Sequence, residues 1–595
     1  MSTTIPPTYP DPEYEAAHQA TYERTPRYPI NPVLPPGIIQ ETWTKAIQAF
    51  VSVLGQDAVL IDSALSDYID PYDIHEADSE NDKRKVPSAA VCPSSTDQLS
   101  AILKIANEFT IPLWTFSRGK NLGYGGPAPR VNGSVALDLH RMNKIIEVND
   151  QFHYAVVEPG VTFIDLYRYC VENGKKVWPS TASLGWGSVM GNTLDRGTGF
   201  GALFTHHQFI AGLEVMLASG DLVRTGQWGI TANDSPNAFL SKFTYGPSIE
   251  GLFLQSNLGV VTKMSIWLQP QPQAFMSCSF SMPFFDDLEV MVDAFSEMRR
   301  NGTIPSCVWF TSLIETLCIA GRREDYWKGE GPIPDWRLEE LRLETGYGHW
   351  YARWGLYGPK RVVEAQFEEI KEVLAKKAPT GTISGTLYAD EEGVNAGKVP
   401  VEHGSMFVGV PQLWSLPLIN WPIPKSKTDG KAAHGDYAPV IPSSGKLVME
   451  WMKKSKPICE ENGVELMADF FMHERHVVLM NMFTWDQTDP LQKKNIKRLY
   501  YGLHQVAKER GYGMYRAHIN HMGECCCVES RIEDLLMHHL TDLIAGLNDF
   551  NEHAYNRFVE KIKDALDPNG ILSPGKQGIW PRGFRHLREH QEYGG

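Results

Sequence analysis

Hydrophobic and polar positions near the start of the chain follow a β-α-β order. A short apolar strand is predicted from Val86. A helix is predicted to open at Thr96, because apolar residues between Leu99 and Ala106 recur at the spacing of one helix face. A second strand is predicted from Ile111 to Phe116. This part of the chain is therefore expected to form a β-α-β unit.

The same pattern continues toward a first domain boundary. Apolar strands are predicted at Val135 to Leu139 and at Tyr154 to Val157, and a helix carries apolar positions from Ile164 to Tyr169. A β-rich run then ends near Pro270 to Pro272. Because clustered prolines end regular structure, we place the boundary of the first domain there.

Residues after this boundary alternate amphipathic helices with apolar strands, which predicts a separate α+β domain. The helices are expected at Asp286 to Arg300 and Arg361 to Lys376, and the strands at Val464 to Phe471 and Val477 to Phe483. The tail after about residue 501 is rich in turns and is expected to return to the first domain. The predicted divisions are an arm (1–40), a first domain (41–272), a second domain (273–500) and a closing part (501–595).

Composition excludes several classes of partner. The chain of 595 residues carries a net charge of -15 and has no basic run, so neither nucleic acid nor an anionic membrane surface is an expected partner. It shows no signal-peptide core and no long apolar stretch, which favours a cytoplasmic protein. Nine cysteines without a CxxC pair indicate neither a disulfide framework nor a zinc ribbon, and the run Cys525 to Cys527 is interpreted as packing or loop residues. His473 and His476 lack an evident third ligand, so no metal site is expected.

Three glycine-rich stretches carry the candidate chemistry. They span residues 117–126, 183–201 and 256–272, and none of them contains GxGxxG opening a helix or GxxxxGK[ST]. Each alone is also compatible with a structural turn. Together, and interleaved with β-α-β segments, they predict an extended ligand whose diphosphate is bound mainly by backbone N–H groups.

Five segments carry a resemblance to a known family. In order and in spacing, the chain from about residue 40 resembles the vanillyl-alcohol oxidase and 4-cresol dehydrogenase family of FAD-linked oxidoreductases through IPLWTFSRGKNLGYGGPAPRVNGSVALDL, VVEPGVTFIDLY, GSVMGNTLDRGTGF, QSNLGVVTKMSIWL and DPNGILSPGKQGIWP. The resemblance implies a two-domain α+β FAD-binding fold of the vanillyl-alcohol oxidase and p-cresol methylhydroxylase type. Its first and last parts would bind FAD, and an α+β cap domain would cover the isoalloxazine ring.

The resemblance also implies which residues contact the cofactor. His434 in AHGDYAPVIPSSG matches the histidine that holds FAD covalently, and Tyr437 is the rival attachment residue because a relative uses tyrosine. Covalent attachment would raise the flavin reduction potential and prevent loss of the flavin. The remaining expected contacts are Ser117, Arg118, Gly119, Lys120, Asn121, Leu122, Pro159, Gly187, Ser188, Gly191, Asn192, Gly197, Gly259, Val260 and Val261.

The implied reaction is hydride transfer from 4-alkylphenols or 4-hydroxybenzyl alcohols to FAD through a quinone-methide. Loss of the phenol proton makes hydride departure possible, so the site must stabilise an oxyanion. In the family two tyrosines and an arginine do this, and Tyr124, Tyr515 and Arg516 stand at the matching positions. Structural packing at a domain seam is the alternative role for each of the three taken alone.

Two departures from vanillyl-alcohol oxidase concern the active site. Ser183 replaces an aspartate near flavin N5, and Phe200 replaces a tyrosine. Counting from His434, Asp469 falls where vanillyl-alcohol oxidase has a threonine facing the substrate. Asp469 is therefore a candidate base for hydrating the quinone-methide, with a structural salt bridge as its alternative role.

Two further expectations concern the partners. Dioxygen is preferred to a cytochrome as the acceptor of the electrons, because no protein partner is visible in the sequence. A homodimer or larger homo-oligomer is expected from the family. The rival functions are a same-fold oxidase of non-phenolic alcohols or carbohydrates and a flavin-binding protein that has lost its activity.

Overall fold

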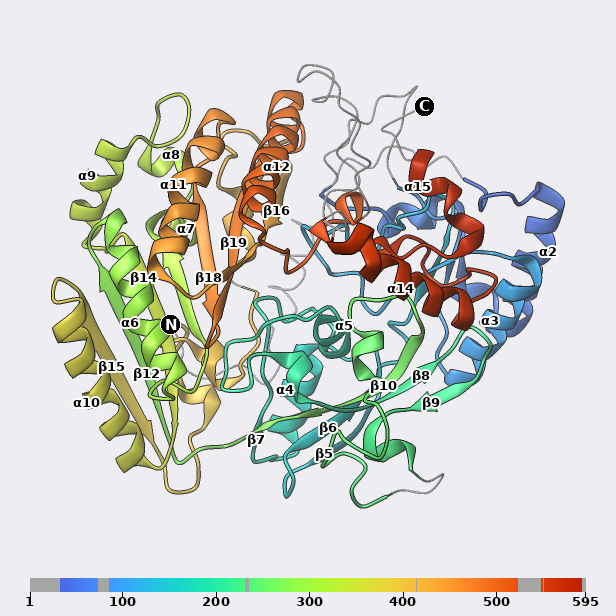
Figure 1. The fold of residues 1–595 in the computed structure, drawn as a ribbon, viewed down its shortest axis with the longest axis horizontal. Helices are drawn as coiled ribbons and strands as arrows, with labels where there is room; N and C mark the ends of the chain where they lie inside the picture. The colour runs from blue at the N-terminus through green and yellow to red at the C-terminus, as the bar shows by residue number, and fades with distance from the viewer. Residues whose placement is uncertain are drawn as a thin grey trace.

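The computed structural model describes residues 33–72, 85–230, 235–413, 415–522, 547–548 and 550–590. The sheets fall into two groups, one on each side of the molecule as drawn in Figure 1. The first group contains the four-stranded, five-stranded and two-stranded sheets, and the second consists of one eight-stranded sheet. The run Cys525 to Cys527 lies outside the described residues. Among the helices of the described ranges, none combines the length and apolarity needed to cross a membrane.

A small, mainly parallel sheet opens the fold, with strand order β1-β2-β4-β3. The helix predicted at Thr96 is α3, which Ser95 caps by accepting a hydrogen bond from the Gln98 amide at 3.2 Å. Its apolar face is buried as predicted, and it packs beside α2. The elements are α2 (Gln40–Leu54), β1 (Val59–Leu60), β2 (Ala90–Val91), α3 (Thr96–Phe109), β3 (Leu113–Phe116) and β4 (Val135–Asp138).

An antiparallel sheet of five strands, in the order β5-β6-β10-β8-β9, follows in the chain. Strand β8 is buried along its whole length, as is expected of a central strand covered on both faces. The elements are β5 (Ile145–Asn149), β6 (Tyr154–Val157), α4 (Phe163–Glu172), β7 (Val177–Trp178), α5 (Val189–Leu194), β8 (Ile210–Met216), β9 (Leu222–Arg224), β10 (Val260–Trp267) and β11 (Gln269–Pro270).

The C-terminal segment lies against the first sheet. Leu113 of β3 donates to Ile571 O and accepts from the Ser573 amide, both at 2.7 Å. Lys563 and Asp567 form a fully buried ion pair at 2.8 Å, and Lys563 also donates to Leu572 O at 2.7 Å. In Figure 1 this segment, with α14 (Phe550–Leu566) and α15 (His586–His590), lies beside the N-terminal helices.

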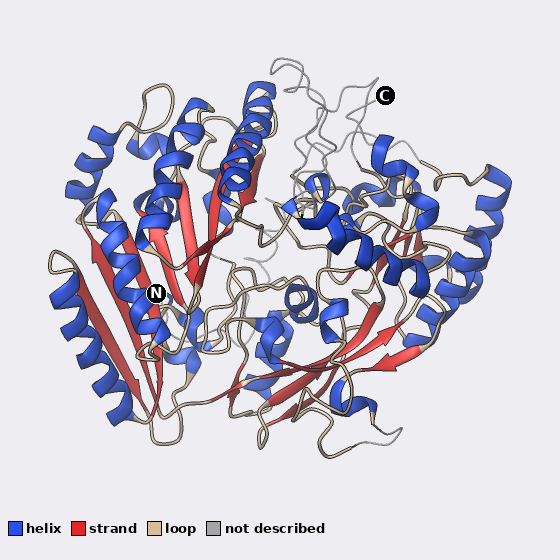
Figure 2. Ribbon diagram, in the orientation of Figure 1, coloured by secondary structure: helices blue, strands red, loops and turns tan. Residues whose placement is uncertain are grey.

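The second group is one antiparallel sheet of eight strands, covered by helices (Figure 2). The sequence of β12 shows why this sheet forms. Met276, Cys278, Phe280 and Met282 alternate with serines, and these four side chains are buried in the core beneath the helices. The strands are β12 (Ala274–Met282), β13 (Val308–Ser312), β14 (Trp350–Gly358), β15 (Thr382–Ala389), β16 (Ala432–Tyr437), β17 (Val440–Pro442), β18 (Met467–Met472) and β19 (His476–Asp486).

Aromatic side chains dominate the core between this sheet and its helices. Phe295 meets Trp354 edge to face with ring centroids 5.1 Å apart, and Phe310 stacks on Phe470 at 4.3 Å. The helices of this part are α6 (Leu288–Arg300), α7 (Leu313–Ala320), α8 (Arg323–Tyr326), α9 (Asp335–Thr345), α10 (Lys360–Lys377), α11 (Gly445–Glu461) and α12 (Pro490–Arg510).

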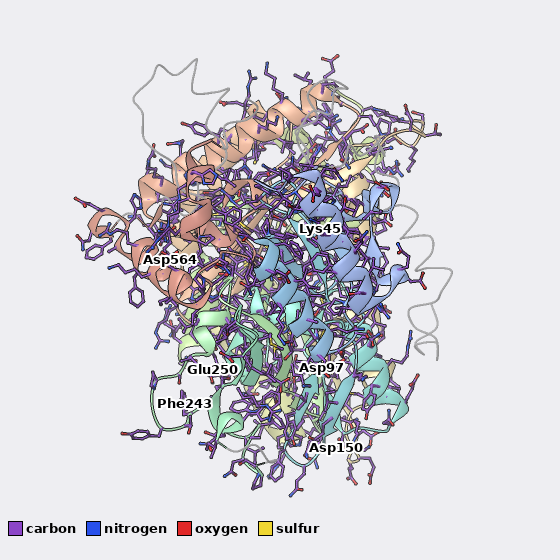
Figure 3. All side chains as sticks on the ribbon, turned by 90° about the vertical axis from the view of Figure 1, so that its right-hand side faces the viewer. Lys45, Asp97, Asp150, Phe243, Glu250 and Asp564 are labelled. Atoms are coloured by element: carbon purple, nitrogen blue, oxygen red, sulfur yellow. The ribbon has the colours of Figure 1, made fainter. Side chains whose placement is uncertain are left out.

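Helix α12 runs without a break through the predicted division at residues 500 and 501. Its buried residues Ile496, Leu499, Leu503 and Ala507 all pack into the core of the eight-stranded sheet. We therefore describe the whole helix with that sheet, while the domain limits stay a prediction. On the face shown in Figure 3, charged side chains such as Lys45 and Asp97 are exposed.

Candidate active site

A cavity of about 420 Å³ lies between the two groups of sheets. Residues of the glycine-rich stretches line one part of it, and residues of the eight-stranded sheet line the other. Every site residue expected from the sequence lines this cavity except Gly197. Gly197 lies behind the wall: its amide donates to Asn192 O at 2.7 Å, and a Cβ there would come within 1.9 Å of the Asn192 side chain. Its lack of a side chain therefore serves packing rather than direct contact with a ligand.

The first glycine-rich stretch forms a tight loop at the end of β3. The amides of Tyr124 and Gly126 both donate to Asn121 O, at 3.2 and 3.1 Å. Gly119 has a φ of +62°, which glycine adopts without strain. Lys120 of the loop also lines the cavity, so backbone N–H groups and a cation are both available to a diphosphate.

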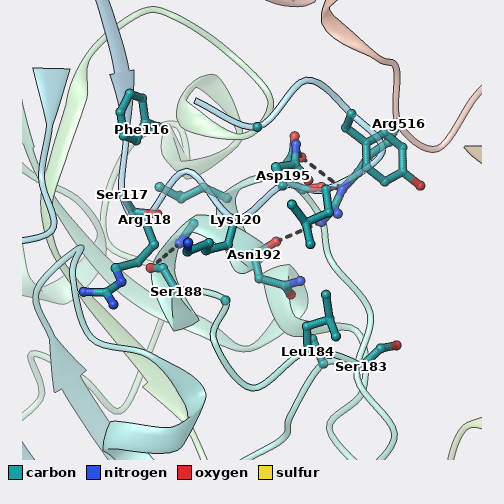
Figure 4. Close-up of a pocket in the computed structure, with 18 of the residues that line it drawn as sticks. Phe116, Ser117, Arg118, Lys120, Ser183, Leu184, Ser188, Asn192, Asp195 and Arg516 are labelled. Atoms are coloured by element: carbon teal, nitrogen blue, oxygen red, sulfur yellow. Dashed lines mark hydrogen bonds and ion pairs between the residues drawn. The ribbon is translucent and has the colours of Figure 1, made fainter. Parts of the chain in front are cut away.

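The second stretch packs directly against this loop (Figure 4). Ser188 caps α5 by accepting from the Gly191 amide at 2.9 Å. A Cβ on Gly191 would come within 2.3 Å of Ser117 Oγ, so only glycine allows the two segments to approach this closely. Pro159, Gly187 and residues 259–261 of the third stretch continue the lining of the cavity. The result is an extended cradle of glycine-rich backbone.

Strand β16 carries the two candidate attachment residues, and the alternation of side chains separates them. His434 lines the cavity, whereas Tyr437 is fully buried on the opposite face, where it stacks on Trp451 and contacts His504. Tyr437 therefore does not reach the cavity and is excluded as the attachment residue.

His434 is available for chemistry within the cavity wall. Its Nδ1 is buried and has no hydrogen-bond partner among the residues that the structure describes. Burial lowers the pKa of His434, which keeps its imidazole neutral. A Cβ on Gly123 would come within 3.0 Å of His434 Nε2, so the histidine packs directly against the loop that follows β3.

Tyr124, Tyr515 and Arg516 come together at one point of the cavity. The Arg516 guanidinium carbon lies 5.6 Å from the Tyr124 ring centroid and 5.2 Å from that of Tyr515. The Tyr515 amide donates to Ala438 O at 2.9 Å, and the Ile519 amide donates to Tyr124 O at 3.1 Å. These backbone bonds tie the segment containing Tyr515 both to the end of β16 and to the first glycine-rich loop.

Arg516 is held in place by the second glycine-rich stretch (Figure 4). Its Nε donates to Asp195 O at 2.9 Å and lies 3.0 Å from Asp195 Oδ2. Burial alone would lower the pKa of Arg516, but the tyrosines and Asp195 beside it outweigh burial and raise it. Burial also raises the pKa of Tyr124, so its hydroxyl stays protonated.

Asp436 was missed by the sequence reasoning. It lies two residues after His434 on β16 and therefore faces the same cavity, where Tyr124 hydrogen bonds to it. Burial raises the pKa of Asp436, although His434, Tyr124 and Arg516 act in the opposite direction. The alternation of strand positions was the signal that could have identified this carboxylate.

Asp469 lies on β18 and faces the cavity, as the sequence comparison implied. Its Oδ2 accepts a hydrogen bond from Trp309 Nε1 at 3.0 Å. Burial raises the pKa of Asp469 to about 7, and the charge of Asp436 adds to the effect. No described cation lies within ion-pair distance of it, so the structural salt bridge considered from the sequence is not formed.

A third buried carboxylate, Glu315 on α7, also lines this end and was not identified from the sequence. Burial raises the pKa of Glu315 well above its usual range, and the neighbouring Asp469 raises it further. Ser183 lines the cavity with an exposed side chain, and Phe200 is buried against Trp309 and Phe471. Apolar residues complete this end: Ile319, Leu416, Ile419, Phe471, Met480 and Met482.

The donors around the cavity fit FAD. The glycine cradle provides close backbone approach for a diphosphate, and the half-buried Lys576, also missed from the sequence, adds a cation to the same wall. His434, with its unpartnered Nδ1, stands where the cradle meets the apolar end. An apolar end with a few polar groups suits an aromatic substrate beside a flavin ring.

Comparison with known proteins agrees with this fit. A family model described as "FAD binding domain" matches residues 87–226, and one described as "FAD linked oxidases, C-terminal domain" matches residues 548–577. The fold and the site thus define an FAD-linked oxidoreductase, which confirms both the cofactor and the class of enzyme expected from the sequence.

Similarity over the full length identifies the family. The 4-cresol dehydrogenase [hydroxylating] flavoprotein subunit of Pseudomonas putida is 33% identical over 557 residues, covering 92% of this chain and 98% of that protein. The chain belongs to the 4-cresol dehydrogenase family of flavoproteins, as its motifs predicted.

Two solved structures share the whole architecture. A 4-ethylphenol oxidase from Gulosibacter chungangensis, in complex with isoeugenol, superposes with a TM-score of 0.82 at 32% identity and covers 93% of this chain and 100% of that chain. A p-cresol methylhydroxylase with substrate bound gives a TM-score of 0.80 at 31% identity, covering 92% of this chain and 99% of that chain. The two-domain FAD-binding fold expected from the sequence is therefore confirmed.

Proposed function

We propose that this enzyme oxidises para-substituted phenols, 4-alkylphenols or 4-hydroxybenzyl alcohols, at the carbon attached to the ring. The observation that carries the proposal is the grouping of Arg516 with Tyr124 and Tyr515 at one point of the cavity wall. Relatives named for 4-cresol and 4-ethylphenol oxidation support this substrate class.

The phenol end of the substrate is bound by this group of three residues. Arg516 keeps its charge because its neighbours raise its pKa, and Tyr124 keeps its proton because burial raises its pKa. A cation and a hydroxyl donor held in a buried site stabilise a phenolate far better than water-exposed groups do. Ionisation of the phenol pushes electron density toward the para carbon, so hydride can leave and a quinone-methide results.

His434 is the proposed covalent link to FAD. It is neutral, its Nδ1 has no hydrogen-bond partner among the described residues, and it packs against the loop that would hold the cofactor. When bound, FAD supplies the acceptor for the hydride. A covalent link also prevents loss of the flavin between catalytic cycles.

Asp469 is the proposed base for adding water to the quinone-methide. Ser183 has a hydroxyl and no carboxylate, whereas burial brings the pKa of the Asp469 carboxyl to about 7. A base whose pKa lies near the working pH is suited to removing a proton from water. Trp309 Nε1 holds one carboxylate oxygen at 3.0 Å and leaves the other for that water.

Dioxygen is the proposed final acceptor of the electrons, and a homo-oligomer is the proposed assembly. The support for dioxygen comes from a solved relative named as an oxidase. Another relative is named as a flavoprotein subunit, so a protein acceptor is the alternative. Oxygen consumption by the purified enzyme during turnover of 4-ethylphenol separates the two acceptors.

Anaerobic mixing with three kinds of compound tests the substrate class. Bleaching of the bound flavin by 4-ethylphenol is expected. Bleaching only by a non-phenolic alcohol or a sugar would instead assign the chain to an oxidase of those compounds and leave Tyr124, Tyr515 and Arg516 without their proposed role. Failure of every compound to bleach the flavin would mean that the protein binds flavin without catalysing oxidation.

A further inference from the structure

A second group of chemically reactive side chains lies outside the cavity, at the carboxyl edge of the four-stranded sheet. It consists of Cys92, Asp138 and His140, whose donor atoms all lie within 4.8 Å of one another. None of the three lines the flavin cavity. Cys92 and Asp138 are buried, whereas the His140 side chain is 41% exposed, so the group opens to solvent on one side.

Strand register builds this group from distant parts of the sequence. Strands β2 and β4 are parallel and pair Ala90 with Ala136 and Val91 with Leu137. The next position on each strand carries Cys92 and Asp138, whose side chains therefore lie on the same side of the sheet. The chain turns directly after Asp138, where the His140 amide donates to Asp138 Oδ1 at 3.0 Å, and this places His140 beside Asp138.

Contacts within the group leave the donor atoms converging on one point. His140 Nδ1 lies 2.9 Å from Asp138 Oδ2. Tyr68, at the end of the 3-10 helix Asp62–Tyr68, donates to the same Oδ2 at 3.0 Å, and its hydroxyl lies 3.7 Å from Cys92 Sγ. A thiol, a carboxylate and an imidazole thus face one another, with a tyrosine hydroxyl supporting the carboxylate from behind.

We propose that Cys92, Asp138 and His140 bind one zinc ion, with water or the Tyr68 hydroxyl as the fourth ligand. Sulfur, nitrogen and carboxylate oxygen are the donors that zinc takes at about 2.0 to 2.3 Å. Donors around such an ion stand roughly 3 to 4 Å apart, so the present spacing needs only small side-chain movements. A thiolate and an imidazole disfavour magnesium and calcium, which take oxygen donors.

The proposed site joins segments that surround the cofactor cavity. It links the 3-10 helix before β2, the end of β2 and the end of β4. Leu139, between two of the ligands, lines the cavity, and its amide donates to Phe116 O at 3.1 Å. A bound ion would therefore fix the end of β4 beside the first glycine-rich loop, and zinc should stabilise the flavin-loaded protein.

The test measures zinc bound to the flavin-loaded enzyme. Protein stripped with EDTA is dialysed against micromolar zinc in excess magnesium, and metal per chain is counted by inductively coupled plasma mass spectrometry. Wild type is expected to retain about one zinc ion per chain. Cys92→Ser and His140→Ala are expected to lose this ion, because each variant lacks one of the three protein ligands. Cys459→Ser and His586→Ala make the same chemical changes outside the group and should retain the ion.

Thermal unfolding provides the second readout. Zinc should raise the Tm of wild type and of both control variants and leave the Tm of Cys92→Ser and His140→Ala unchanged, because a ligand stabilises only a fold that binds it. His140 is partly exposed, so its loss leaves the core intact. Zinc retention by all variants, or no zinc retained by wild type, would overturn the proposal and leave the group as a hydrogen-bonded network.

Discussion

Replacing Arg516 by alanine removes the guanidinium that lies within 5.6 Å of the Tyr124 ring centroid and 5.2 Å of the Tyr515 ring centroid. The guanidinium is 11% exposed and is held by Asp195 through contacts of 2.9 and 3.0 Å, so it is fixed before a substrate arrives. A charge-assisted hydrogen bond contributes about 1.5 to 3 kcal/mol. At about 1.4 kcal/mol for each factor of ten, binding of a phenolate inhibitor should weaken by roughly 10 to 150-fold.

The assay is a titration of the flavin-loaded enzyme with a non-reactive phenol, followed by the change in flavin absorption. Tyr124→Phe should also weaken binding, while both variants keep their flavin. Arg516→Lys should fall between wild type and Arg516→Ala, because lysine keeps the charge but not the planar fork. Arg337→Ala, on the distant helix α9, is the matched control for loss of an arginine and should bind as wild type does.

The dependence of affinity on pH makes the result specific. Wild type should bind the phenol more tightly as pH rises toward the pKa of the free phenol, and Arg516→Ala should lose most of this gain. Equal affinity of Arg516→Ala and wild type at every pH would refute phenolate stabilisation by this residue. A loss of flavin together with inhibitor binding would assign Arg516 to the structure of the cofactor site instead.

Three further predictions concern other residues. Denatured wild type should stay yellow after acid precipitation, whereas His434→Ala should release its flavin; free release from wild type would remove the covalent link. Because the Asp469 carboxyl has a pKa of about 7 and acts as a base only when ionised, the ratio of hydroxylated to unsaturated product from 4-ethylphenol should fall below about pH 7 in wild type. In Asp469→Asn the ratio should be low at every pH, and an unchanged ratio would exclude Asp469 as the base. Lys563→Met leaves Asp567 buried without its cation, so the free energy of unfolding measured with urea should drop by about 3 to 5 kcal/mol; a change within error would show that water reaches the pair.

Much of the cofactor site could be predicted from the sequence, because it is built from contiguous motifs. The loop after β3 and the second glycine-rich stretch both line the cavity, and their glycines are required where two backbones meet, as at Gly191. Periodicity located α3 at its first residue, and the structure shows that Ser95 caps the helix at this start. Features of this kind can be predicted from the sequence because they are formed by residues that are close together in the chain.

Groups assembled by tertiary packing could not be predicted in the same way. Glu315 reaches the cavity only because α7 packs beside β18, and Cys92 meets Asp138 only through the register of β2 and β4. No local pattern encodes either arrangement. Asp436 is an intermediate case, because strand alternation from His434 places it on the cavity side once β16 is known to be a strand.

The choice between His434 and Tyr437 shows how the structure resolves an alternative that the sequence leaves open. The two residues are close in the chain and both are chemically able to hold a flavin. An odd spacing of three along β16 puts them on opposite faces, and only His434 lines the cavity. The sequence motif alone could not distinguish the two residues, because it does not show that both lie on one strand.

We propose that the enzyme oxidises a phenol by stabilising its phenolate beside the flavin. Anaerobic stopped-flow reduction by 4-ethylphenol and by 4-ethylanisole tests it most directly, since the two compounds differ by one methyl group that blocks ionisation. We expect rapid bleaching of the flavin by 4-ethylphenol and none by 4-ethylanisole. Equal rates of bleaching by the two compounds would contradict it.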